Sequence, residues 1–261
     1  QAEDGIRDRS PSRGLGDVYK RQIYDIHNHL LPGVDDGPQE LSEAIKICKI
    51  AESQNTKAVI VTPHRKDVNE NLSVQIVKDL VLEINQTLKE DKSDIEIKLG
   101  MENHIDLALL RDVEEGKALT LNDSGYILVE MPWEGRPPYI EDIIANLLSY
   151  GLTPVLAHPE RMNVFEEEPK LLFDFVQMGC ISQLTASSLY GKFGNNALNN
   201  SIDIMKHGLA HVIASDTHMA AGQRCYDMEL GFTHAKRIVG LDMATRMCSI
   251  NPLAVLQNQR I

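Results

Sequence analysis

Residues 23–31 have the sequence Ile23-Tyr24-Asp25-Ile26-His27-Asn28-His29-Leu30-Leu31. Their β-branched and apolar residues predict a strand, in which side chains alternate between the two faces of a sheet. Asp25, His27 and His29 would then share one face. Two imidazoles two residues apart on a rigid strand can bind one metal ion, and a carboxylate beside them can orient a ring or bind as well. The alternative for this stretch alone is a pair of surface histidines on an edge strand.

Strand-like segments alternate with helical ones along the rest of the chain. The seven strand segments are 23–31, 57–64, 95–102, 126–130, 153–158, 180–186 and 211–218. This alternation predicts an α/β fold with a parallel sheet built from right-handed βαβ units. An open doubly wound sheet would satisfy it, but polar residues stand at the C-terminal ends of six of these segments. They could all converge only in a closed α/β barrel, whose strand ends surround one pocket.

Composition restricts the class of protein. The chain has 261 residues, enough for one large α/β domain, and its 43% hydrophobic and 25% charged residues are ordinary for a soluble protein. A formal net charge of −12 disfavours non-specific binding to nucleic acid or to an anionic membrane. No apolar run approaches the ~18 residues of a membrane-spanning helix, so membrane insertion is not expected.

The four cysteines exclude two kinds of site. They form no C-x-x-C pair, and none is followed six residues later by the arginine of a C-x5-R phosphatase loop. The sequence therefore predicts neither a disulfide framework nor a thiol-based phosphatase, and a reduced, cytoplasmic setting fits.

Residues 1–22 differ from the rest of the chain. They mix glycine, serine, proline and charged residues without periodicity and contain no methionine. We expect a non-native or disordered leader here, and one domain over residues 23–261.

The polar residues at the strand ends form a set of metal-ligand types. They are His27, His29, His64, Glu102, Glu130, His158, Asp216 and His218, joined by Asp35 or Asp36 from the loop after the first strand. Nitrogen and oxygen ligands without thiolate suit manganese, iron or zinc. Eight or nine ligands exceed the four to six or so that one ion uses, so two or three ions sharing a bridging carboxylate are expected. Clustered ions of this kind activate water and bind a phosphoryl group. The other four histidines are expected to be structural: His104, His207, His211 and His234.

Three arginines stand at or beyond the same strand ends: Arg65, Arg161 and Arg224. Guanidinium groups there could bind phosphate oxygens with two hydrogen bonds each. The alternative is a salt bridge to a nearby carboxylate.

Short motifs at these positions together resemble the PHP (polymerase and histidinol phosphatase) superfamily over the chain from Ile23 onward. They are Asp25-Ile26-His27-x-His29, Thr62-Pro63-His64-Arg65, Gly100-Met101-Glu102, the strand ending in Glu130, His158-Pro159-Glu160-Arg161 and Ser215-Asp216-x-His218. Within it, two stretches resemble the bacterial capsule and exopolysaccharide-locus protein-tyrosine phosphatases: Val34-Asp35-Asp36-Gly37-Pro38 and Gln183-Leu184-Thr185-Ala186-Ser187-Ser188.

The resemblance implies a distorted (β/α)7 barrel with a trinuclear site, usually loaded with Mn²⁺, at the C-terminal ends of the strands. It implies one ion held by His27, His29, Glu102 and Asp216. It implies a second held by Glu102, Glu130 and His158, and a third held by Asp36, His64 and His218. Arg161 would match the family's phosphate-binding arginine. The implied substrate is phosphotyrosine on a bacterial tyrosine autokinase that controls polysaccharide export.

The leading hypothesis is therefore a metal-dependent protein-tyrosine phosphatase that uses metal-activated water. One alternative is a small-molecule phosphatase of the same superfamily, such as one acting on histidinol phosphate. A second is a non-catalytic, metal-stabilised binding module. The sequence leaves the oligomeric state open.

Overall fold

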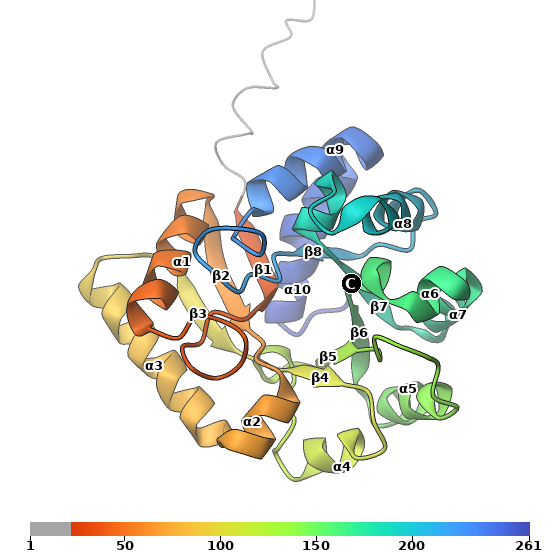
Figure 1. Ribbon diagram of the computed structural model, residues 1–261, viewed down its shortest axis with the longest axis horizontal. Helices are drawn as coiled ribbons and strands as arrows, with labels where there is room; N and C mark the ends of the chain where they lie inside the picture. The colour runs from red at the N-terminus through yellow and green to blue at the C-terminus, as the bar shows by residue number, and fades with distance from the viewer. Residues whose placement is uncertain (1–21) are drawn as a thin grey trace, which may run out of the picture.

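The computed structural model describes residues 22–261, so the expectation for the leader lies, apart from Gln22, outside the described residues. The strands, in chain order, are β1 Ile23–Asn28, β2 Thr56–Val61, β3 Glu96–Leu99, β4 Glu102–His104, β5 Tyr126–Glu130, β6 Thr153–Ala157, β7 Ile181–Thr185 and β8 Val212–Ala214. The α-helices are α1 Leu41–Ser53, α2 Arg65–Asn71, α3 Val74–Glu90, α4 Leu109–Glu114, α5 Ile140–Ser149, α6 Asn163–Glu167, α7 Pro169–Met178, α8 Gly194–Lys206, α9 Met228–Thr245 and α10 Asn251–Leu256 (Figure 1). Short turns of other helix types are η1 Leu121–Asp123, η2 Pro159–Arg161, η3 Ala186–Tyr190 and η4 Arg246–Ile250. No helix in the described part of the chain is both long and apolar enough to cross a membrane.

The predicted α/β alternation is confirmed, with every strand pair parallel. Strands β1-β2-β3 form one sheet and β4-β5-β6-β7-β8 form a second. The strand predicted over residues 95–102 ends at Leu99, and Glu102, which was predicted to end it, begins the separate strand β4 after a break at Gly100 and Met101. A Cβ atom at Gly100 would lie 2.6 Å from Cγ2 of Ile60, so only glycine allows the backbone to pass this close to β2.

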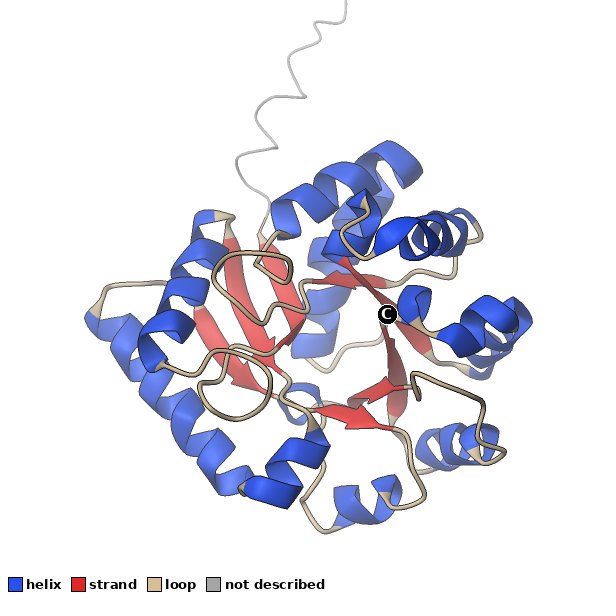
Figure 2. Ribbon diagram, viewed as in Figure 1, coloured by secondary structure: helices blue, strands red, loops and turns tan. Residues whose placement is uncertain are grey.

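Backbone hydrogen bonds join the two sheets where their strands end. The amide of His29 donates to the carbonyl of Thr217 at 2.9 Å, and the amide of Glu102 donates to the carbonyl of Pro63 at 3.1 Å. Figure 2 shows the strands arranged around a central region with the helices outside them. The carboxyl ends of strands from both sheets therefore meet. A continuous seven-stranded barrel stays a prediction.

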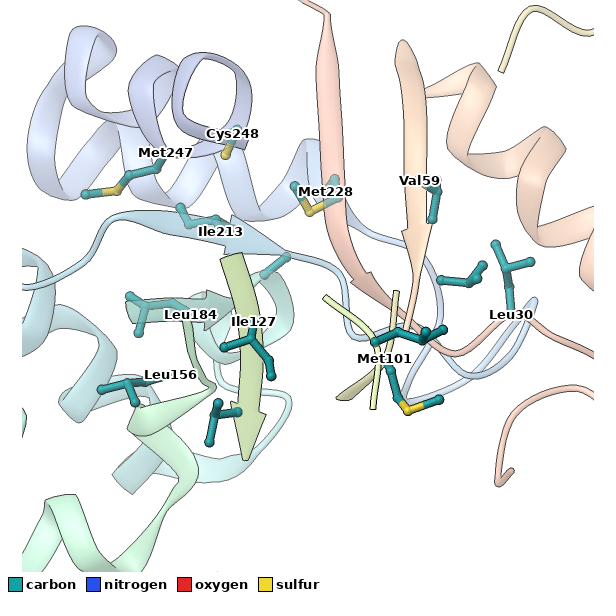
Figure 3. Close-up of a cluster of buried hydrophobic side chains, with 14 of the residues drawn as sticks. Leu30, Val59, Met101, Ile127, Leu156, Leu184, Ile213, Met228, Met247 and Cys248 are labelled. Atoms are coloured by element: carbon teal, nitrogen blue, oxygen red, sulfur yellow. The ribbon is translucent and has the colours of Figure 1, made fainter. Parts of the chain in front are cut away.

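The buried apolar side chains fall into two clusters on opposite faces of the strands. Ile127, Leu156, Leu184 and Ile213 belong to the larger cluster, together with residues from the helices (Figure 3). Their neighbours along the strands form the smaller cluster, which includes Leu128, Val155, Ala157, Val212 and Ala214. Because side chains alternate along a strand, the face that carries Leu128 next carries Glu130, whereas Asp216 lies just beyond the end of β8, in a turn. The inner face thus changes from apolar to acidic toward the carboxyl ends.

Candidate metal centre

The structure brings all nine predicted ligand residues together at the carboxyl ends of the strands. They form four overlapping groups, and within each group the donor atoms lie within 4.8 Å of one another. The groups are His29-Asp36-His64-His218, His27-His29-Asp216, His27-Glu102-His158 and His64-Glu102-Glu130. A cavity of about 260 Å³ opens over them. Its lining residues are Asp36, His64, Lys66, Asp67, Glu102, His104, Glu130, Trp133, His158, Arg161, Asp216 and Arg224.

Glu102 lies at the centre of the cluster and is 1% exposed. Its Oε1 lies 3.1 Å from Nε2 of His158 and 3.4 Å from Nε2 of His27. Its Oε2 lies 3.1 Å from Nδ1 of His64 and 3.3 Å from Nε2 of His29. One carboxylate therefore faces four imidazoles with both oxygens, which is the arrangement that a bridging metal ligand requires.

Hydrogen bonds on the far side of two rings fix their orientation. Nδ1 of His27 lies 2.7 Å from Oε1 of Gln183, and Nδ1 of His29 lies 2.7 Å from Oδ2 of Asp35. The Nε2 atoms of both rings consequently point at each other, 3.1 Å apart, as two ligands of one ion would. The structure thus places Asp36 among the ligands and Asp35 behind His29. That Gln183 orients His27 was not predicted from the sequence. The available signal was that Gln183 stands two residues after Ile181 on β7, and Ile181 belongs to the smaller apolar cluster on the inner face.

Of the three residues predicted to share one face, His27 and His29 do point at each other, but the prediction is wrong for Asp25. The pairing register between β1 and β2 shifts between Asp25 and Asn28, so the simple alternation is broken there. The buried Asp25 carboxylate instead accepts hydrogen bonds from the Ser215 amide at 3.0 Å, the Ser215 hydroxyl at 2.6 Å and the Asn28 side chain at 3.2 Å. Asp25 therefore ties β1 to the segment after β8.

Two of the predicted ligand residues have backbone conformations that L-residues rarely adopt. His158 has φ of 33° and Asp216 has φ of 51°, both in the left-handed region. Such positions cost roughly 1–3 kcal/mol each and persist where surrounding structure enforces them. Here the turns follow β6 and β8 directly, and they aim both side chains into the cluster.

The electrostatics of the cluster favour bound cations. Burial lowers the pKa of His29, but the Asp35 and Glu102 carboxylates together raise it to about 9. Burial also lowers the pKa of His64, but Asp36 and Glu102 raise it to about 11. Burial and neighbouring Arg161 lower the pKa of His158 to about 4, while burial and the Glu102 carboxylate raise the pKa of Glu130. These buried nitrogen and oxygen donors, with two carboxylates repelling each other, fit divalent cations.

Metal binding is expected to release protons at pH 7. The pKa values of His29 and His64, about 9 and about 11, keep both rings protonated in the metal-free protein. A ligating imidazole must be neutral, so these protons leave and metal affinity rises with pH. Calorimetric Mn²⁺ titrations in buffers of different ionisation enthalpy would count them, and His64→Ala should release about one fewer. A binding enthalpy independent of the buffer would contradict this expectation.

Two of the three predicted arginines lie at the cavity. Arg161 donates through Nη1 to Oδ2 of Asp216. Arg224 donates through Nη1 to Oδ2 of Asp36 at 2.7 Å. The guanidinium groups are thus placed beside two of the predicted ligand carboxylates.

The expectation that Arg65 binds phosphate is wrong. Its side chain is fully buried away from the cavity, and it donates to Asp112, to Oδ2 of Asp106 at 2.7 Å and to the backbone carbonyl of His104 at 3.0 Å. Arg65 begins α2, and helical geometry turns its side chain toward α4 instead of the strand ends. Arg65 therefore forms salt bridges to Asp106 and Asp112, which agrees with the alternative given for the arginines from the sequence.

The fold and the site together define a class: a parallel α/β protein whose strand ends carry a cluster of histidines and carboxylates that could hold metal ions. The chain belongs to the CpsB/CapC family of capsular polysaccharide synthesis, whose model matches residues 23–257.

Similar proteins cover most of the chain. A CapC protein from Staphylococcus aureus is 36% identical over 196 residues, which are 75% of this chain and 77% of that protein. Tyrosine-protein phosphatase YwqE from Bacillus subtilis is 31% identical over 92% of this chain and 93% of its own. A solved structure from work on YwqE and Streptococcus pneumoniae CpsB, described as metal-dependent tyrosine phosphatases, matches with a TM-score of 0.84 at 31% identity. It covers 92% of this chain and 96% of that one.

Proposed function

We propose that this protein is a metal-dependent phosphomonoesterase that hydrolyses phosphotyrosine in proteins. The observation that carries the proposal is the cluster centred on Glu102, with nine ligand residues and the guanidinium groups of Arg161 and Arg224 at one cavity. The described activity of its relatives supports the same assignment. The substrate we propose is a bacterial tyrosine autokinase of capsule or exopolysaccharide biosynthesis, in the cytoplasm.

Two or three Mn²⁺ ions would occupy the site, with iron or zinc as alternatives. His27, His29 and Asp216 would hold one ion, and Glu130 and His158 another, with Glu102 shared between them. Asp36, His64 and His218 would hold the third. The chemistry such ions supply when bound is activation of water and neutralisation of phosphoryl charge.

The protein's own groups position the phosphate. Arg161 and Arg224 each reach the cavity beside a ligand carboxylate, so a phosphate held there would meet two guanidinium groups. A planar guanidinium group can bind two phosphate oxygens at once. It thereby stabilises the negative charge that these oxygens carry in the transition state. Gln183 and Asp35 hold His27 and His29 in the orientation that ligation needs.

We also propose that residues 23–261 are one domain and that its two sheets make up a single distorted (β/α)7 barrel. In support, the family match extends over residues 23–257, and hydrogen bonds join the strand ends of the two sheets. In this arrangement β3 and β4 count as one interrupted strand.

Turnover is expected to depend on metal and to survive thiol alkylation. Chelator should abolish phosphotyrosine hydrolysis and Mn²⁺ should restore it, because the proposed reaction uses metal-activated water and no cysteine among the described residues lines the cavity. Cys48, Cys180 and Cys248 are buried, and Cys225 is partly exposed and outside the cavity lining. Phosphate release should be measured after chelation and after iodoacetamide treatment, with circular dichroism as the control for folding. Full activity in excess chelator, or inactivation of the folded protein by alkylation, would contradict the proposal.

Two alternatives make different predictions. A histidinol-phosphate phosphatase would turn over histidinol phosphate faster than a phosphotyrosine peptide, so side-by-side kcat/KM values separate the two. A non-catalytic binding module would bind metal without turnover of either substrate. One closed structural site needs about four ligands, whereas nine converge here. This surplus favours the enzyme.

A further inference from the structure

Trp133 is unlike the other residues that line the cavity. It is the only tryptophan in the chain, and 49% of its surface is exposed. Among the described residues of the cavity lining, Trp133 alone has no charged or titratable side chain. The proposed metal ions and a phosphate group account for most of the charged residues around it. They do not account for a half-exposed indole, because exposed apolar surface is unfavourable in water.

The indole is held in a fixed position beside the metal centre. Its ring stacks on the ring of His158, with centroids 5.7 Å apart and an interplanar angle of 22°. Cζ of Arg161 lies 5.2 Å from the indole centroid and 4.1 Å from that of Phe193, so the guanidinium group lies between two aromatic rings. The same loop is anchored further on, where Arg136 pairs with carboxylates of α5 and of the residue before α7.

We propose that Trp133 is the residue that recognises the aryl group of the substrate. This inference rests on the proposed function. In an aryl phosphate one oxygen joins the ring to phosphorus, so the ring must lie directly above the site that binds the phosphate. Trp133 stands at that level, because it covers His158, a proposed ligand, and contacts Arg161, a proposed phosphate-binding group. Aromatic rings gain from stacking on an indole beyond simple burial, whereas an alkyl phosphate such as phosphoserine has no ring to place there.

The test compares two non-hydrolysable ligands with the same headgroup, phenylphosphonate and methylphosphonate, on the Mn²⁺-loaded protein. Calorimetry should show phenylphosphonate binding about tenfold more tightly to the wild type. Trp133→Ala should remove that preference while changing the Kd of methylphosphonate by less than about twofold. Because Trp133 is the only tryptophan, phenylphosphonate should also change the fluorescence of the wild-type protein, and methylphosphonate should change it much less.

Phe193→Leu provides the matched control. Phe193 contacts Arg161 but is not among the cavity-lining residues, so its replacement should weaken both phosphonates by the same factor and leave their ratio intact. A tenfold preference that survives in Trp133→Ala would overturn the inference, as would an equal loss for both ligands. Either result leaves the proposed function standing if the wild type hydrolyses a phosphotyrosine peptide. If the wild type binds neither phosphonate and does not hydrolyse the peptide, both the inference about Trp133 and the proposed function are overturned.

Discussion

Replacing Glu102 by Gln is expected to lower kcat/KM for a phosphotyrosine peptide by about 10³-fold or more, together with the loss of bound metal. The carboxylate faces His27, His29, His64 and His158 at 3.1 to 3.4 Å, so its two oxygens serve more than one proposed ion. Glutamine has nearly the same shape but no charge, and its amide nitrogen cannot act as a metal ligand. The variant tests whether one shared carboxylate holds the centre together.

The measurements are metal content by mass spectrometry, steady-state kinetics and a thermal melt. Glu160→Gln makes the same chemical change at another buried carboxylate, which accepts hydrogen bonds from the Thr185 amide at 2.9 Å and the Ser188 hydroxyl at 2.7 Å. That control should keep its metal, because Glu160 belongs to none of the ligand groups. If Glu102→Gln keeps full metal content and turnover, Glu102 is not a shared ligand and the assignment of the centre is wrong.

Replacing Arg161 by Ala is expected to lower kcat/KM by about 30- to 1,000-fold and to leave metal content unchanged. The change removes a charge-assisted contact to phosphate in a partly desolvated site, worth roughly 2–4 kcal/mol. Asp216, the carboxylate with which Arg161 pairs, keeps its other neighbours, because Oδ1 lies 3.6 Å from Nε2 of His27 and 3.7 Å from Nε2 of His29. The metal ligands should therefore stay in place.

Two further variants show whether the loss in Arg161→Ala comes from substrate binding or from metal binding. Arg161→Lys should recover only part of the loss, since an ammonium group lacks the planar pair of donors. His158→Ala should lose both metal and activity, because His158 belongs to a ligand group. Metal stoichiometry and kinetics for all three variants decide between the roles. Loss of metal in Arg161→Ala would mean that the arginine supports the metal ligands, and wild-type kinetics would mean that it does not touch the substrate.

Local pattern was sufficient to find the residues of the centre because strand ends are visible in the sequence. Glu130 ends an apolar strand whose inner face continues to it with period two, and His64, His158 and Asp216 stand just beyond such strands. A parallel α/β fold brings the carboxyl ends of its strands to one level. Residue type and position along a strand therefore predicted the ligand set before any contact was known.

The sequence failed where the outcome depended on distant partners. Arg65 resembles a residue of the site by position, but Asp106 and Asp112, more than 40 residues away, surround its guanidinium group. Nothing in the local sequence indicates that the strand is interrupted at Gly100. The reason that glycine is required there is the close approach of Ile60, 40 residues earlier in the chain. Asp25 was expected beside the histidines, and it binds Ser215, 190 residues away, instead.

The sequence by itself determined the alternation of strands and helices and the ligand-type residues at the strand ends, because each follows from local periodicity and chemical type. Tertiary structure decided which carboxylate binds and which orients, as with Asp36 and Asp35, and it selected Gln183 as the partner of His27. Those choices depend on distances and angles between elements packed together from across the chain. A shift of one residue in strand pairing is enough to change them.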